Sequence, residues 1–163
     1  MADFQNPEAF WQLIKSKNEK GANYKIHFTG TVGPAVINSL ERAGLKDYYK
    51  IKGFLQYNDL IKEFDEADIL LVCPYDKNHI PEKLFEYLRS GKPIIAFCDD
   101  NPEVASILNN SGAGMLFSFS ESGSEFFDKK FEPDLTEAQK YERKNIATQL
   151  SEILLTQIKT TER

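Results

Sequence analysis

One segment in the middle of the chain, residues 80–97, constrains the fold more than any other. Its letters, IPEKLFEYLRSGKPIIAF, begin as an amphipathic helix, stop at Gly91 and continue directly into an apolar strand. A strand that is apolar on both faces is typical of a parallel sheet covered by helices on both sides. The segment therefore predicts a helix, a tight turn and a buried strand of an α/β domain.

The same alternation of helix and strand continues along most of the chain. Strands are expected at 24–29, 48–54, 68–74, 93–98 and 113–119, and helices at 35–43, 57–67, 81–90 and from 101 to near 112. Two of the strands, DILLVCP and PIIAFC, are too apolar to face water on either side. The pattern predicts a single α/β domain over residues 1–163, with a Rossmann-like parallel sheet and helices on both faces.

The chain is expected to open with a helix, because Asn6 suits a helix cap and Pro7 a first helical position. Residues 15–23 are expected to form the loop that follows. A Rossmann-like unit ordinarily begins with a strand. This opening therefore suggests that the first strand of the fold is missing and that the chain is a fragment of a larger protein.

The C-terminal part of the chain is expected to form one long amphipathic helix over residues 136–158. Thr136 could cap it, with Gln139 three positions later completing a capping box.

Charge and cysteine usage exclude several classes of protein. The formal net charge of -5 argues against non-specific nucleic-acid binding, which requires a basic surface. Cys73 and Cys98 lie inside apolar runs, form no CxxC pair, and have no metal-ligand spacing with His27 or His79. The sequence therefore gives no reason to expect a metal site or a redox-active cysteine pair.

Targeting signals are also lacking in the sequence. No apolar run approaches the ~20 residues that a membrane-spanning helix needs. The first residues, MADFQNP, lack the basic and apolar regions of a signal peptide. A cytoplasmic location is expected, and peripheral attachment at the inner face of a membrane stays open.

Several short strings follow one another along the chain: IHFTG at 26–30, the segment 44–54, LIKEFDEADILLV at 60–72, PEKLFEYL at 81–88 with GKP at 91–93, and YERKN at 141–145. In this order they resemble the C-terminal, donor-binding domain of retaining GT-B glycosyltransferases of the group 1 (family 4) type. The most specific is PEKLFEYL followed by GKP, which resembles the family pattern "P.KlfEyla.GkPvi", and the other strings are weaker. The resemblance covers nearly all of the chain from Tyr24 onward.

The resemblance implies roles for two charged residues of the central helix. Glu86 matches the glutamate that binds the ribose hydroxyls of the nucleotide sugar, and a carboxylate can accept two hydrogen bonds from such a diol. Lys83 would add a positive charge beside the diphosphate. The alternatives are a solvated glutamate, and a surface lysine paired with Glu82 or Glu86.

The loop before that helix would border the diphosphate. Residues 77–81, including Asn78, His79 and Ile80, are expected to offer backbone N–H groups at the positive end of the helix. Asn78 is a departure, because many family members carry a second glutamate at this position that reaches toward the donor sugar. An isolated loop histidine such as His79 is more often solvated than bound to a ligand.

Two further turns complete the implied site. Gly30 and Thr31 begin a turn that lies beside the diphosphate in the family, although a plain helix-entry turn would explain the same residues. Phe54 and Leu55 belong to the segment whose backbone borders the base.

The implied reaction is transfer of a sugar from a nucleoside diphosphate sugar to a saccharide or lipid-linked acceptor, in surface polysaccharide or glycoconjugate synthesis. The donor is a substrate, and no cofactor or metal is expected. The acceptor would be held by a missing N-terminal domain, so the fragment alone is expected to be inactive. Two alternatives are a flavodoxin-like, non-catalytic signalling or interaction domain and a sugar-nucleotide epimerase domain.

Overall fold

The computed structural model describes residues 1–161, except for the side chains of residue 143 and of residues 156–161. The strands are β1 (Ile26–Phe28), β2 (Tyr49–Ile51), β3 (Leu70–Val72), β4 (Ile94–Phe97) and β5 (Gly114–Phe117). The α-helices are α1 (Glu8–Glu19), α2 (Pro34–Arg42), α3 (Tyr57–Glu66), α4 (Glu82–Ser90), α5 (Pro102–Asn110), α6 (Leu135–Gln139) and α7 (Arg143–Thr161). Two short 3-10 helices are η1 (Lys46–Tyr48) and η2 (Ser124–Asp128).

Every strand pair is parallel, and helices alternate with strands along the chain, which confirms the predicted Rossmann-like α/β class. The strands form two sheets, one of β1 and β2 and the other in the order β3-β4-β5. In the larger sheet Leu71 pairs with Ile95, and Ile95 pairs with Met115. An isolated bridge joins Gly30 to Gly53 just beyond the smaller sheet.

Two apolar cores lie on opposite faces of β4, whose four residues are all buried. Ile95 and Phe97 project into a core with Trp11 and the inner faces of α1 and α2. Ile94 and Ala96 project into a second core beneath α4 and α5. The alternation follows from the two-residue period of a strand, which sends neighbouring side chains to opposite faces.

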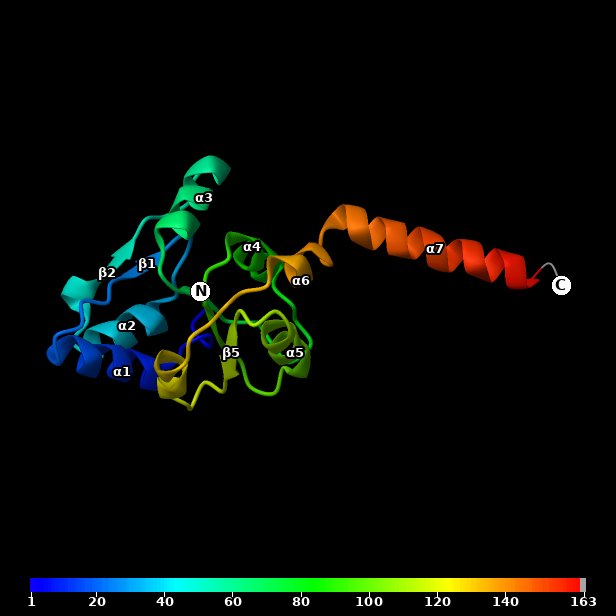
Figure 1. Ribbon diagram of the computed structural model, residues 1–163. Helices are drawn as coiled ribbons and strands as arrows, with labels where there is room; N and C mark the ends of the chain where they lie inside the picture. Colours follow the sequence, from blue (N-terminus) through cyan, green and yellow to red (C-terminus); the bar gives the residue numbers. More distant parts are fainter. Residues whose placement is uncertain (162–163) are drawn as a thin grey trace.

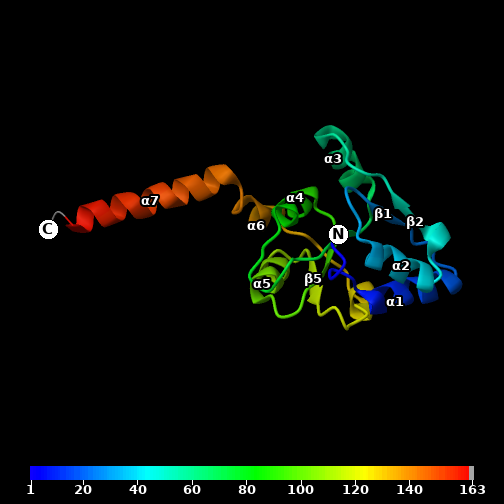
Figure 2. The ribbon, with the colours of Figure 1, turned by 180° about the vertical axis from the view of Figure 1, so that it is seen from behind.

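The elements are arranged as two groups around the N-terminus. Both views place the N-terminus between β1 and β2 on one side and α4 and α5 on the other, with α3 above it (Figures 1 and 2). Helix α7 extends away from the rest of the molecule (Figures 1 and 2).

The predicted start of the chain was partly wrong. The helix α1 begins at Glu8, and Asn6 makes no capping bond to it; instead the Asn6 side-chain oxygen accepts the indole N–H of Trp11 at 2.9 Å. The helix also continues to Glu19 through most of the expected loop. The buried Asn18 side chain explains this extension, because it bonds both the N–H and the carbonyl of Tyr24 and so ties the helix end to β1.

The single C-terminal helix predicted at 136–158 was also wrong. The segment divides into α6 and α7, and α6 is capped by Asp134, whose carboxylate accepts the N–H of Thr136 at 2.8 Å. The break falls where Tyr141 packs its ring against Phe85 of α4, with 5.0 Å between ring centroids. Anchoring of this turn on α4 competes with continuation of the helix, and no local sequence pattern reveals that contact.

Candidate functional site

The sequence-predicted site residues follow the carboxyl ends of three strands. Gly30 and Thr31 follow β1, Phe54 and Leu55 follow β2, and residues 78–80 lie between β3 and α4. Ligands of open parallel sheets bind at this rim of the sheet. We call it the carboxyl rim.

The turns after β1 and β2 meet through their glycines. The N–H of Gly30 donates to the carbonyl of Gly53 at 2.6 Å, and both residues have positive φ, +86° and +68°. Only glycine adopts such angles without strain. A β-carbon at Gly30 would lie 3.9 Å from the ring of Phe54, so this ring lies beside the turn. It is 88% exposed, and Leu55 next to it is half-buried.

The loop after β3 is closed by its own hydrogen bonds. Asp76 accepts the N–H of Asn78 through its carboxylate at 2.8 Å and the N–H of His79 through its carbonyl at 3.2 Å. These two N–H groups, expected to face a diphosphate, are thus engaged within the loop. The ring Nδ1 of His79 accepts the N–H of Tyr75 at 2.9 Å, so a neutral His79 carries its proton on Nε2.

A buried asparagine holds that loop in place. Asn101 is 1% exposed, and its side-chain oxygen caps α5 by accepting the N–H of Val104 at 3.0 Å. Its side-chain nitrogen donates to the carbonyls of both Asp76 and His79, each at 3.0 Å. The sequence predicted Asn101 only as a helix start. Its link to a loop 22 and 25 residues earlier leaves no signal in the sequence.

Helix α4 presents its N-terminus to the carboxyl rim without a side-chain cap. The N–H of Leu84 donates to the carbonyl of Pro81 at 2.9 Å, which leaves the N–H groups of Glu82 and Lys83 and the positive end of the helix dipole available to an anion. Leu84 and Leu88 bury the inner face of the helix, while Lys83 is exposed and Glu86 half-buried. Over the described residues no ion pair joins Lys83 to Glu86 or to Glu82, which counts against the paired-lysine alternative.

Residues 1–5 bring the two sides of the rim together. The amino group of Met1 donates to the carbonyl of Thr31 at 2.6 Å, and the side-chain amide of Gln5 donates to the carbonyl of Cys73. Burial lowers the pKa of the Met1 amino group, and the positive charge of Lys83 lowers it further. Lys83 is thus close enough to this amine, and so to the turn after β1, to affect its charge.

An aromatic pair at the rim includes a residue that the sequence did not single out. The rings of Phe4 and Tyr75 meet edge to face with 4.7 Å between centroids, and both are exposed. No periodic pattern marks Phe4, because it lies in an irregular segment that only the fold brings to the rim.

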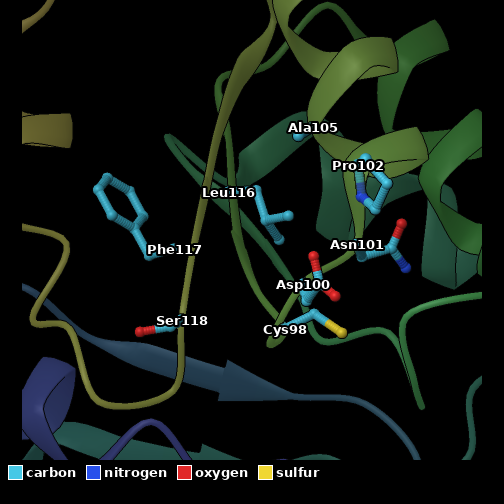
Figure 3. A pocket seen from close by; sticks show the side chains of 8 residues that line it. All are labelled: Cys98, Asp100, Asn101, Pro102, Ala105, Leu116, Phe117 and Ser118. Carbon is cyan, nitrogen blue, oxygen red and sulfur yellow. The ribbon is translucent and has the colours of Figure 1, made fainter.

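A shallow cavity of about 280 Å³ lies at the carboxyl ends of β4 and β5 beside α5 (Figure 3). Cys98, Asp100, Asn101, Pro102 and Leu116 are among its lining residues, and Phe117 points to the other side of β5 from Leu116 (Figure 3). None of the sequence-predicted site residues lines it. One of its lining residues, Asn101, is also the residue that bonds the carbonyls of Asp76 and His79, so the cavity and the 75–80 loop share this side chain.

Within the described residues, no three His, Cys, Asp or Glu side chains are grouped so that they could hold a metal ion. None of the helices in the same part of the chain has the length and apolar character to cross a membrane.

The fold and the carboxyl rim define the class of protein. It is a Rossmann-like α/β domain in which the N-terminus of a helix and two glycine turns lie at the carboxyl ends of the strands. The model of the glycosyl transferases group 1 family matches residues 7–129, and the chain therefore belongs to this family. The match spans α1 to η2 and leaves α6 and α7 outside. No curated protein and no solved structure matches the chain. Family membership favours glycosyl transfer over the signalling and epimerase alternatives.

Proposed function

We propose that the chain is the C-terminal, donor-binding domain of a retaining GT-B glycosyltransferase. It binds a nucleoside diphosphate sugar at the carboxyl rim, and the sugar passes to a saccharide or lipid-linked acceptor of surface polysaccharide or glycoconjugate synthesis. The observation that carries this proposal is the uncapped N-terminus of α4, with Lys83 and Glu86 on its first turns, at the same rim as the glycine turns. Membership in the family supports glycosyl transfer in general.

The diphosphate lies at the N-terminus of α4. The N–H groups of Glu82 and Lys83 donate to phosphate oxygens, and the helix dipole favours the negative charge. Lys83 adds a mobile positive charge, and the Nε2–H of His79 is directed away from the bond that its Nδ1 makes within the loop. Stabilising the charge that develops on the leaving diphosphate is the main catalytic contribution of such a site.

The nucleoside lies toward Glu86 and the turn after β2. The half-buried Glu86 accepts two hydrogen bonds from the ribose hydroxyls, for which it has no competing ion pair among the described residues. The exposed ring of Phe54 offers a flat apolar face to the base. Gly30 keeps the opposite side of the rim open to the diphosphate, because it lacks a side chain.

The acceptor and the residues that complete catalysis belong to a second domain of the parent enzyme. Residues 1–163 therefore bind the donor without transferring its sugar. We expect this because the site lies at one open rim of a single sheet, where water is not excluded from the reacting sugar.

The experiment is a calorimetric titration of residues 1–163 with UDP, GDP and ADP, repeated with Glu86→Ala and Lys83→Ala. Removing a charged partner of a hydrogen bond costs about 1.5–3 kcal/mol, so Glu86→Ala is expected to weaken binding at least about tenfold. Glu66→Ala, at an exposed position at the end of α3, is the matched control and should leave the affinity unchanged. Binding of Glu86→Ala as tight as that of the unmodified chain would remove Glu86 from the site.

A further inference from the structure

Helix α7 carries apolar side chains that no other part of the described molecule covers. It extends away from the body of the molecule (Figures 1 and 2), and the described side chains from residue 146 to residue 155 are all exposed. Its first turn is held in place, because the side chain of Asn145 donates to the carbonyl of Gln139 at 2.6 Å and Tyr141 packs on Phe85 of α4. The helix is thus anchored at its start and accessible to another molecule from residue 146 onward.

Ile146, Leu150 and Ile153 form a narrow apolar stripe along α7. Each residue of a helix turns by about 100°, so spacings of four and three residues place these side chains within about 60° of one another. This is the a/d spacing of helices that pair side by side in a coiled coil. Leu154 lies at one border of the stripe, and Leu155 lies on the opposite side of the helix.

The described residues that border the stripe carry no charge. Ala147 and Leu154 flank it on one side and Gln149 on the other, whereas Lys144 and Glu152 lie farther round the helix. In paired helices the bordering positions select the neighbouring helix, because their charges attract or repel the charges on it. Uncharged borders therefore allow an identical helix to approach without like charges meeting.

The charges of α7 also argue against a membrane surface as the occupant of the stripe. Helices that lie in the membrane interface are rich in Lys and Arg on their polar face. Residues 144–155 include one lysine and one glutamate, and the whole chain has a formal net charge of -5. Anionic lipid would gain little from such a helix, so another protein surface is the better match.

The exposed area of the stripe reaches what a specific interface needs. At 50–59% exposure, each side chain of the stripe and Leu154 keeps roughly 100 Å² in water, so two copies together would bury about 800 Å². The bordering Ala147 and Gln149 bring the total to about 1,000 Å², the lower limit for a specific protein interface. Two α7 helices can therefore cover each other's stripes, and an interface of this size predicts weak, reversible pairing.

We propose that α7 pairs with α7 of a second copy of this chain, antiparallel, along the stripe. With the two-fold axis between residues 151 and 152, near the middle of α7, Leu150 of each copy lies against Ile153 of the other. We call these two equivalent contacts the central contacts. The antiparallel direction places the positive end of each helix dipole beside the negative end of the other, and keeps the two bodies at opposite ends of the pair (Figure 1).

The test is sedimentation equilibrium of residues 1–163 over about 1–500 µM, a range that brackets the micromolar dissociation constant expected for a small interface. Leu150→Glu brings a carboxylate into both central contacts and should raise the dissociation constant at least about a hundredfold. This inference does not depend on which ligand binds at the carboxyl rim.

Leu155→Glu is the matched control. Leu150 and Leu155 are 55% and 56% exposed on the same helix, so the two variants change net charge and helix propensity equally and differ only in the face that they alter. Leu155→Glu should leave the dissociation constant within about threefold of that of the unmodified chain.

Mixing Leu150→Glu with Ile153→Lys tests the direction of pairing, and separates lost pairing from a helix that fails to fold. In the mixed antiparallel dimer the introduced glutamate lies against the introduced lysine, and the other central contact stays apolar. The mixed dimer should therefore form at least about tenfold more tightly than either variant with itself. In a parallel pair each position would meet its own counterpart, and mixing would leave a charge against an apolar side chain at both.

Three results would overturn the inference: an unmodified chain that stays monomeric over this range, an equal effect of Leu155→Glu, or mixing without recovery. A monomeric chain that sediments with vesicles of phosphatidylserine and phosphatidylcholine would assign the stripe to a membrane, and would also overturn it.

Discussion

The side-chain nitrogen of Asn101 lies 3.0 Å from the carbonyl oxygen of His79, and this bond joins the loop before α4 to the start of α5. A second bond from the same nitrogen reaches the carbonyl of Asp76. Because Asn101 is fully buried, water cannot replace either bond when the side chain is removed. The shape of the loop that borders the candidate site therefore depends on Asn101, which lies between β4 and α5.

Asn101→Ser separates the two tasks of this side chain. Serine can still cap α5 but has no amide to reach the two carbonyls. The free energy of unfolding should fall by about 1–3 kcal/mol in urea denaturation, and the amides of Asn78 and His79 should exchange faster. Asn110→Ser is the control, since Asn110 is exposed on the same helix and its side chain bonds its neighbour Ser106 at 3.3 Å. Unaltered exchange at residues 78 and 79 would show that the loop holds its shape without Asn101.

Gly114→Ala should destabilise the larger sheet. A β-carbon at Gly114 would lie 1.8 Å from the carbonyl oxygen of Ile94, and a backbone atom inside a ladder cannot move aside. We expect a loss of about 3 kcal/mol in the free energy of unfolding, at the upper end for overpacking. At Gly21 a β-carbon meets nothing within 4 Å, so Gly21→Ala costs only the strain of its positive φ, about 1 kcal/mol. Equal losses for the two variants would contradict the close approach of β4 and β5.

The ion pair between Lys52 and Glu63 should make stability depend on pH. The ammonium of Lys52 lies 2.6 Å from both carboxylate oxygens of Glu63, and this hydrogen bond lowers the pKa of Glu63. A carboxyl whose pKa is lower in the folded state adds stability above its unfolded pKa, about 4.3, and loses that contribution as the pH falls through the folded value.

Glu63→Gln should therefore lower the free energy of unfolding by about 1 kcal/mol at pH 7 and have progressively less effect below pH ~4. Urea denaturation between pH 3 and 7 measures the difference. Glu66→Gln, three residues later and exposed, serves for comparison. Its free energy of unfolding should depend on pH in the same way as that of the unmodified chain. A Glu63→Gln effect that stays constant over this range would rule out the ion pair as its cause.

Cys73 should be unreactive in the folded protein. Burial raises the pKa of its thiol to about 12, and burial likewise raises the pKa of Cys98. Since the thiolate is the reactive form, iodoacetamide at pH 8 should label neither cysteine until urea unfolds the chain, as followed by mass spectrometry. A cysteine placed at the exposed Ser120 should be labelled at once under the same conditions. Rapid labelling of Cys73 in the native protein would contradict its burial beside β3.

Much of the fold could be predicted from the sequence because helices and strands carry periodic patterns. The apolar runs around Leu71 and Ile95 predicted two buried parallel strands, and the structure pairs these residues in register. Gly91 marked the end of the helix that carries Lys83 and Glu86, and it adopts the left-handed conformation there. These features depend on residues a few positions apart, whose types alone decide the local conformation.

The sequence by itself determined the elements, their order and the helix on which the two charged residues lie. Only the tertiary structure decided that Asn101 holds the loop of His79, that residues 1–5 bridge the rim, that the C-terminal helix breaks near Tyr141, and that β1 and β3 belong to separate sheets. Each of these depends on groups far apart in the chain that meet when the cores form. Such contacts are selected by packing and hydrogen-bond geometry, for which a single sequence carries no periodic signal.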